Sequence, residues 1–171
     1  MMKFDELELA FLEMGEADIP LLTPVMKRAF DDDAQKHLDQ ESGGPPGYDD
    51  GEFFRTWLLP YKESVGYVIM NGKSLIGGII VWILPEGHNI LGTIFIDPDY
   101  QDIGVGAQTW RYIEETYPET KSWRLATPTW ATKNHHYYKK CGFLEVESDP
   151  LIPAEEGTTI YRKDLLQDSI N

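Results

Sequence analysis

The fold is decided by the stretch Ile94-Phe95-Ile96-Asp97-Pro98-Asp99-Tyr100-Gln101-Asp102-Ile103-Gly104-Val105-Gly106-Ala107. An apolar segment typical of a β-strand runs into a Gln-x-x-Gly-x-Gly turn, and this turn opens a helix. Backbone N–H groups at a helix start have no partner within the helix, and glycines let the chain curl so that these donors converge on an anion. Gly104 and Gly106 also lack the side chains that would keep a pyrophosphate away. The stretch therefore predicts a phosphate-binding turn.

Two other phosphate-binding motifs fit this turn less well. A dinucleotide-binding fingerprint needs a third glycine, and Thr109 stands in that place. A Walker loop ends in Gly-Lys-Ser/Thr, and no lysine follows these glycines before Lys121. Neither motif describes the turn.

A second signature lies downstream, in Asn134-His135-His136-Tyr137-Tyr138-Lys139-Lys140-Cys141-Gly142-Phe143. This run reads as a short helix that ends on Gly142 in the left-handed conformation. A strand is expected to follow over 143–147, because apolar and polar residues alternate there.

Together the two signatures resemble the GNAT superfamily of acetyl-CoA-dependent N-acetyltransferases. In that superfamily the turn after the fourth strand holds the pyrophosphate of acetyl-CoA. A Tyr-x-Lys-x-Gly-Phe element places its tyrosine beside the thioester sulfur, and Tyr138, Lys140 and Gly142-Phe143 match it here. The resemblance implies an acyltransferase with acetyl-CoA (coenzyme A) as cosubstrate.

The order of elements along the chain matches the superfamily over nearly its whole length. Strands are expected over 7–11, 67–70, 75–84, 90–96, 123–127, 143–147 and 158–163, and helices over 19–30, 107–117 and around Tyr138. A mobile loop with a short helix is expected over 31–62. The predicted fold is an α/β domain of the α+β type, one domain over 1–171. Its mixed, mostly antiparallel sheet has six to seven strands flanked by helices, with a splayed parallel pair of central strands.

The resemblance also assigns residues to the cofactor. The pantetheine arm would lie between the splayed fourth and fifth strands and bond to the backbone of Phe95 and Ile96. The pyrophosphate would be held by the turn residues Gln101, Asp102, Ile103, Gly104, Val105, Gly106 and Ala107. Many relatives carry an asparagine two turns before the tyrosine, where this chain has Ala131. Asn134, one turn before Tyr138, either faces the cofactor or serves the helix start or surface.

The chemistry requires an uncharged amine, a polarised carbonyl and a proton for the departing thiolate. Thiols have a pKa near 8.5 and phenols one near 10, so the hydroxyl of Tyr138 is a feasible general acid. Some relatives place a glutamate near the start of the fourth strand, but Ile90 aligns there. His88 would share its strand face and is the candidate base, with a water relay and a plain turn residue as alternatives. Asp97 and Glu86 are poorer candidates.

The amino-acid composition limits the kinds of molecule that this protein is expected to bind. The formal net charge of -14 and the pI of about 4.5 argue against nucleic acid and anionic membrane as partners. A single cysteine, Cys141, excludes an internal disulfide. No signal peptide or membrane-spanning stretch is recognised, so a cytoplasmic enzyme is expected. A homodimer is one alternative for its oligomeric state. Adjacent His135 and His136 diverge on a helix, so no metal is expected.

The region 31–62 is expected to line the acceptor side of the cleft, as it does in the superfamily. Its carboxylates, including Asp49 and Asp50, alternate with aromatic residues and suit a cationic amine. A solvated loop without a substrate role is the alternative. Two functions stay open: acetylation of a small-molecule or peptidyl amine, and an inactive acyl-CoA-binding sensor or interaction module.

Overall fold

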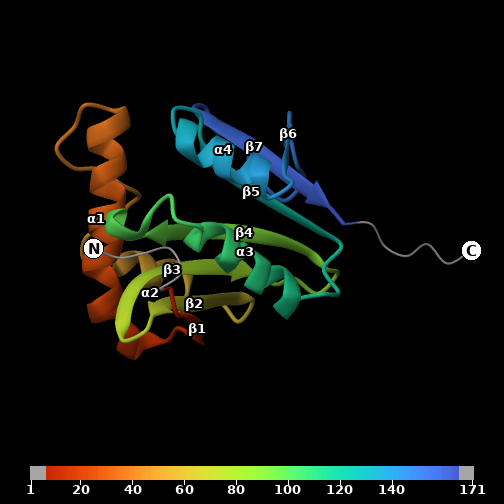
Figure 1. The fold of residues 1–171 in the computed structure, drawn as a ribbon. Coiled ribbons are helices and arrows are strands. Elements are labelled where there is room, and N and C mark those ends of the chain that lie inside the picture. The colour runs from red at the N-terminus through yellow and green to blue at the C-terminus, as the bar shows by residue number, and fades with distance from the viewer. Residues whose placement is uncertain (1–6, 166–171) are drawn as a thin grey trace, which may run out of the picture.

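Seven strands form one continuous sheet in the computed structural model, which describes residues 7–165 (Figure 1). Their order across the sheet is β1-β2-β3-β4-β5-β7-β6. The strands are β1 (Leu9–Glu13), β2 (Ser64–Asn71), β3 (Ser74–Trp82), β4 (His88–Ile96), β5 (Ser122–Pro128), β6 (Leu144–Val146) and β7 (Thr158–Asp164). The helices are α1 (Ile19–His37), α2 (Glu52–Trp57), α3 (Val105–Thr116) and α4 (Thr132–Lys140), with short 3-10 helices η2 (Glu16–Asp18) and η3 (Pro98–Tyr100).

Helices cover both faces of the sheet. Side chains of α1 and α2 form one apolar cluster with Ile80 and Phe95. Side chains of α3 and α4 form another with Val81 and Trp123. Successive residues of a strand point to opposite faces, which is why the neighbours Ile80 and Val81 belong to different clusters. The layered arrangement and the mostly antiparallel sheet confirm the predicted fold class.

The parallel pair β4 and β5 is joined over only three residue pairs. The last of these pairs is Ile90 with Arg124. Beyond it β4 stays paired with β3 and β5 with β7, but the two strands no longer pair with each other. The pairing of β3 with β4 shifts by one residue at Gly92, a bulge that bends a strand and increases its twist. The predicted splay therefore begins directly after Ile90 and Arg124.

Helix α1 is longer than the sequence pattern predicted. The aspartates from Asp31 onward indicated a loop, yet the helix continues to His37. Lys27 reaches the carboxylate of Asp31 at 2.6 Å, and Lys36 reaches that of Asp32 at 2.9 Å. Both are pairs four residues apart on one helix face, an arrangement that stabilises a helix. Two of the three aspartates that suggested a break are thus paired within the helix.

Other boundaries differ by about one helical turn or less. Strand β1 begins at Leu9 and not at residue 7, and β4 begins at His88 and not at residue 90. Helix α3 begins at Val105, two residues before its expected start, because Gly104 precedes it in the left-handed conformation. The phosphate turn is therefore tighter than the pattern alone indicated.

Gly77 is required where β3 and β4 pack closely. A Cβ at this position would collide with the backbone carbonyl oxygen of Phe95 in the neighbouring strand. We expect Gly77→Ala to lower the free energy of unfolding by about 2 kcal/mol or more, because the strand backbone has to shift. Urea unfolding measures this change. Gly15→Ala is the matched control, since a Cβ there meets nothing within 4 Å and φ is -137°; equal losses in both variants would contradict the packing argument.

Candidate functional site

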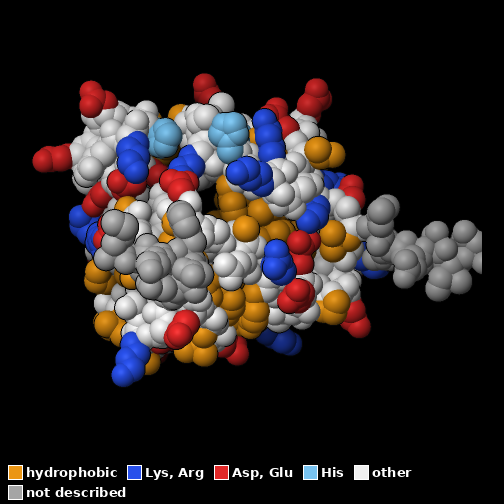
Figure 2. Space-filling model, viewed as in Figure 1, with side chains coloured by type: hydrophobic (Ala, Val, Ile, Leu, Met, Phe, Trp, Pro, Cys, Tyr) orange, Lys and Arg blue, Asp and Glu red, His pale blue; other side chains and the backbone are white. Residues whose placement is uncertain are grey.

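A cleft of about 960 Å³ opens where β4 and β5 separate. Segments 29–45, 92–96, 100–107 and 126–140 contribute to its walls. The cleft thus lies between the C-terminal half of α1 on one side and β5 with α4 on the other. On the face drawn in Figure 2, apolar side chains lie in a hollow below a row of Lys, Arg and His side chains. This face combines local positive charge with an apolar floor, although the whole chain is acidic.

The turn between β4 and α3 presents backbone donors to this cleft. Asp102 and Gly104 have φ values of 63° and 91°, so the chain curls through the left-handed region twice within three residues. Among the described residues, no side chain caps the start of α3. The N–H groups of the first turn, at Val105, Gly106 and Ala107, therefore lack partners within the helix. Curled backbone of this kind and a helix N-terminus both favour an anion.

Gln101 and Lys133 tie the turn to the neighbouring elements. The Gln101 amide donates to the carbonyl oxygen of Ile96 at 2.9 Å, and its Oε1 accepts from Lys133 Nζ at 2.7 Å. Lys133 also lies 3.2 Å from the carboxylate of Asp102. The Gln101 side chain thus holds the end of β4 against α4, and Lys133 places a cation beside the turn. Sequence reasoning did not single out Lys133, which no spacing rule connects to a turn 31 residues earlier.

Packing of Tyr137 gives Gly106 a structural reason in addition to the expected one. A Cβ there would lie 2.8 Å from Cε1 of Tyr137. The Tyr137 hydroxyl donates to the carbonyl oxygen of Gly106 at 2.8 Å, so the α4 tyrosine packs directly on the first turn of α3. Tyr137 therefore joins the two helices that border the cleft.

Tyr138 lines the same cleft and is only 7% exposed. Burial raises the pKa of its phenol well above the usual value, and the nearby Cys141 and Asp33 raise that pKa further. Within residues 7–165 the structure gives its hydroxyl no hydrogen-bond partner, and that oxygen is not among the fully enclosed polar atoms. A protonated hydroxyl group thus faces the cleft.

The other residues expected at the cofactor divide into two groups. Those with atoms on the cleft wall are Phe95, Ile96, Gln101, Asp102, Gly104, Gly106, Ala107 and Asn134. Ile103 and Val105 instead pack with Ile69 and Ile76, so only their backbone could reach a ligand. The Asn134 amide donates to Thr127 Oγ1 on β5 at 3.3 Å, which links α4 to the wall of the cleft.

His88 does not line this cleft. Strand β4 does extend to His88, as its assignment to the face of Ile90 required. Its Nδ1 lies 2.6 Å from Ser122 Oγ, and the ring lines a second cavity at the paired end of β4 and β5. Of the two poorer base candidates, Asp97 is buried and bound by Arg28 at 2.8 Å, and Glu86 lines the second cavity.

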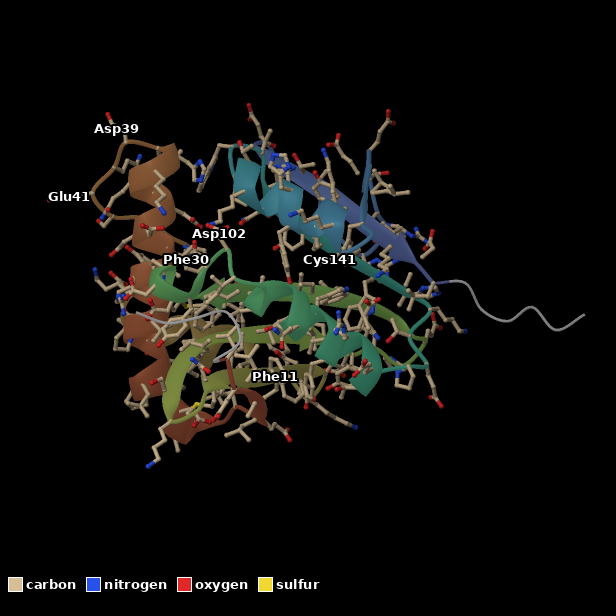
Figure 3. All side chains as sticks on the ribbon, in the orientation of Figure 1. Phe11, Phe30, Asp39, Glu41, Asp102 and Cys141 are labelled. Atoms are coloured by element: carbon tan, nitrogen blue, oxygen red, sulfur yellow. The ribbon has the colours of Figure 1, made fainter. Side chains whose placement is uncertain are left out.

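The acidic region after α1 contributes less to the cleft than expected. Asp49 and Asp50 are exposed and are not part of its wall. Asp39 and Glu41 point outward from the end of α1 (Figure 3). Asp33 does line the cleft, and burial raises the pKa of its carboxyl. This residue lies on α1, not on a loop.

Neither a metal cluster nor a membrane-spanning helix occurs within residues 7–165. This part of the chain contains no group of three or more His, Cys, Asp or Glu side chains placed to hold a metal ion. His135 instead contacts the Tyr161 hydroxyl at 2.6 Å and the carbonyl oxygen of Pro128 at 3.1 Å. No helix of the same residues is both long and apolar enough to cross a bilayer.

The fold, the glycine turn and the adjacent tyrosine define an acetyltransferase. Residues 26–143, well over half of the chain, match the acetyltransferase (GNAT) family. The chain belongs to this family and is an enzyme of the N-acetyltransferase class, which confirms the resemblance seen in the sequence. The family uses acetyl-CoA.

Relatives support the assignment at the level of sequence and fold. The chain is 36% identical over 135 residues to the uncharacterized protein YrkN of Bacillus subtilis, covering 77% of this chain and 71% of YrkN. An acetyltransferase from Thermus thermophilus is similar in structure, with a TM-score of 0.74, 17% identity, and 94% and 99% of the two chains covered. A PaiA N-acetyltransferase from Thermoplasma acidophilum, solved in complex with coenzyme A, has a TM-score of 0.74, 14% identity, and coverage of 92% and 99%.

Gly104 allows a test of the turn as the CoA-binding element. Gly104→Ala would strain a backbone with φ of 91° and misalign the donors at the start of α3. We expect calorimetric titration to show CoA binding weakened by at least about tenfold, roughly 1.4 kcal/mol.

Gly157→Ala is the matched control for this strain. Its φ is 84°, a Cβ there meets nothing within 4 Å, and the residue lies outside the cleft wall. The control variant should bind CoA as the parent does. Unchanged affinity in a folded Gly104→Ala protein would remove the turn from the CoA site.

Proposed function

We propose that this protein transfers the acetyl group of acetyl-CoA to a primary amine of a small molecule or peptide by direct attack. The observation that carries the proposal is the Tyr138 hydroxyl, which faces the same cleft as the glycine turn and lacks a protein partner within the described chain. A pyrophosphate on the turn and a thioester near Tyr138 would place pantetheine along the open edge of β4. Phe95 and Ile96 would bond it there, since this edge is unpaired beyond Ile90.

Tyr138 would act on the leaving group. The amine nitrogen forms a bond to the thioester carbonyl carbon, the carbon–sulfur bond breaks, and negative charge develops on the sulfur. The phenol donates a hydrogen bond to that sulfur and then its proton, the amine gives up its own proton to a general base, and the phenol regains a proton from solvent. Its raised pKa keeps the hydroxyl protonated at neutral pH, so the donor is present whenever the thiolate forms.

His88 is our candidate for the general base, and a water relay is the alternative. Ile90 carries no proton acceptor, so the base has to come from another position. His88 is two residues earlier on β4, on the same strand face. A base there lies on the side of the second cavity, away from the thioester, so the amine proton would reach it through water.

Asp33 favours a cationic amine as the acceptor. Among the acidic residues of segment 31–62, Asp33 is the one that lines the cleft. Its negative charge raises the pKa of Tyr138. A protonated amine would approach this carboxylate before it loses its proton. Cytoplasmic location, homodimeric assembly and a single domain over 1–171 stay predictions.

An inactive acyl-CoA sensor is the second candidate, and Ile90 is the observation that favours it. Loss of a carboxylate at that position is compatible with a protein that binds the cofactor without transferring its acyl group. The two candidates differ in product formation. Mass spectrometry of a reaction with acetyl-CoA and a library of primary amines separates them, because only the enzyme forms acetylated products.

Tyr138→Phe tests the chemical role of the hydroxyl. We expect kcat to fall by about a hundredfold or more with nearly unchanged CoA affinity, because only an interaction with the leaving sulfur is lost. The parent should show no loss of kcat from Tyr138 ionisation below about pH 10, since burial raises this pKa. Steady-state kinetics across pH and calorimetry with CoA measure both quantities.

Tyr137→Phe is the neighbouring control. It removes the hydrogen bond to Gly106, so it should affect stability or CoA affinity more than kcat. A loss confined to KM in Tyr138→Phe would instead make Tyr138 a binding residue.

His88→Gln tests the base. We expect kcat/KM to fall by at least about tenfold with unchanged CoA affinity, within the range of lost base catalysis. His136→Gln is the control, because His136 lines the main cleft and has no assigned catalytic role. A His88→Gln enzyme as active as its parent would favour the water relay.

A further inference from the structure

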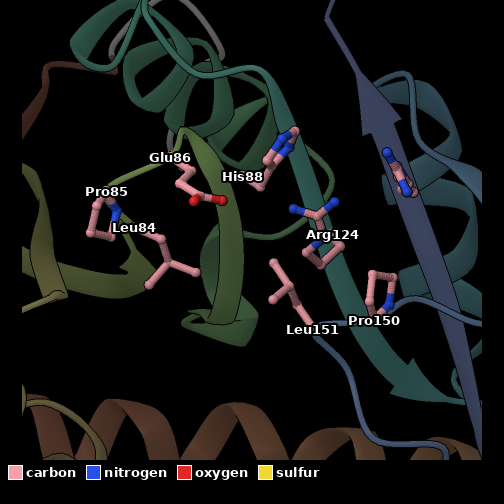
Figure 4. Close-up of a pocket in the computed structure, with 8 residues that line it drawn as sticks. Leu84, Pro85, Glu86, His88, Arg124, Pro150 and Leu151 are labelled. Carbon is pink, nitrogen blue, oxygen red and sulfur yellow. The ribbon is translucent and has the colours of Figure 1, made fainter.

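The second cavity, of about 530 Å³, has walls that differ from those of the main cleft. Four of its lining residues are apolar: Leu84, Pro85, Pro150 and Leu151. Its charged lining residues are Glu86, Arg124 and Arg162, with His88 beside them (Figure 4). Two arginines thus line one cavity in a chain whose acidic residues outnumber its Lys and Arg by 29 to 15.

Arg124 is the unusual residue of this cavity. It is 2% exposed, and its Nε donates to Asp149 at 3.1 Å. Its Nη1 is buried without a hydrogen-bond partner among residues 7–165. Asp149 Oδ2 also lacks such a partner within the described chain, and Arg162 Nη1 stands 3.6 Å from it. A buried guanidinium donor without an acceptor is costly, so an arginine of this kind beside a cavity points to a ligand that supplies an acceptor to the guanidinium group.

The position of Arg124 in the sheet connects this cavity to the reaction. Arg124 and Ile90 form the last pair of the parallel ladder, directly before β4 and β5 separate. Arg124 stands between Trp123 and Leu125, which pack toward α3 and α4, so its side chain points to the opposite face of the sheet. Ala126, two residues further along that face, already lines the main cleft. Two residues of strand span about 7 Å, which is close to the distance from a guanidinium nitrogen to the amino nitrogen of an α-amino acid whose carboxylate it binds.

We propose that the second cavity binds the carboxylate of the acceptor, and that the acceptor is an α-amino acid with an apolar side chain. This inference rests on the proposed acetyl transfer. The carboxylate would accept from Arg124, supported by Arg162, while the apolar residues contact the side chain. The amino group would then extend past the end of the β4–β5 ladder toward the thioester. Arg124 is thus a specificity-determining residue that selects an amine bearing a carboxylate.

Three matched acceptors test this selection. Leucine has the carboxylate, leucinamide has a neutral amide in its place, and 3-methylbutylamine has neither. We expect kcat/KM for leucine to exceed both others by at least about tenfold, as for a charge-assisted hydrogen bond. Binding of leucine to the CoA-loaded protein, measured by calorimetry, should show the same preference. Equal use of all three amines would overturn the carboxylate site and leave the acetyltransferase proposal intact.

Variants separate recognition from folding. Arg124→Lys keeps a positive charge beside Asp149 but removes the guanidinium fork, so leucine should lose its tenfold preference while CoA affinity stays within about twofold. Arg162→Gln, at a side chain that is 33% exposed, provides the same test if Arg124→Lys does not fold. Arg111→Gln, at an exposed residue of α3 outside both cavities, is the control and should keep the preference.

The readouts distinguish the two proposals. Leucine binding that depends on Arg124 without any acetyl product would support the carboxylate site and contradict the transfer. Acetylation of leucine with its full preference retained in folded Arg124→Lys and Arg162→Gln proteins would overturn the site.

Discussion

The site depends on the separation of β4 from β5 after Ile90 and Arg124. Backbone N–H and C=O groups require partners, and a central strand usually finds them on both edges. Here β4 stays hydrogen-bonded to β3, and β5 stays hydrogen-bonded to β7, so the sheet remains continuous. The edges of β4 and β5 that face each other are left unpaired. The open edges would offer an extended amide ligand the bonds that a strand would have made.

The groups beside this gap suit an anionic ligand, although the chain as a whole is acidic. Net charge of -14 disfavours an approaching phosphate, so binding has to come from donors at short range. The curled turn and the uncapped start of α3 supply such donors, and Lys133 adds a cation held by Gln101 and Asp102. Tyr137 fixes α4 against the same helix start, which places its neighbour Tyr138 on the wall of the cleft.

Opposite charges are distributed between the two cavities. Asp33 on α1 faces the main cleft, and burial raises its pKa, so its carboxylate is sensitive to the charge of whatever lies there. Arg124 and Arg162 face the second cavity on the far side of the β4–β5 junction. A ligand with an amine at one end and a carboxylate at the other would match this distribution. The sheet itself, through the alternation of side chains along β5, keeps the arginine and the apolar core apart.

The sequence alone determined the strands, the glycine turn and the helix that carries Tyr138, because these features are local patterns over contiguous residues. The splayed pair was expected only from the resemblance to the family. The sequence did not determine the length of α1, since the aspartates after residue 30 are stabilised by pairs that only the formed helix brings together. It also missed Lys133, the Tyr137–Gly106 contact and the buried Arg124–Asp149 pair. Each joins residues 25 to 32 positions apart, and only the tertiary structure decided them, because side chains from separate elements meet only once the sheet and helices have packed.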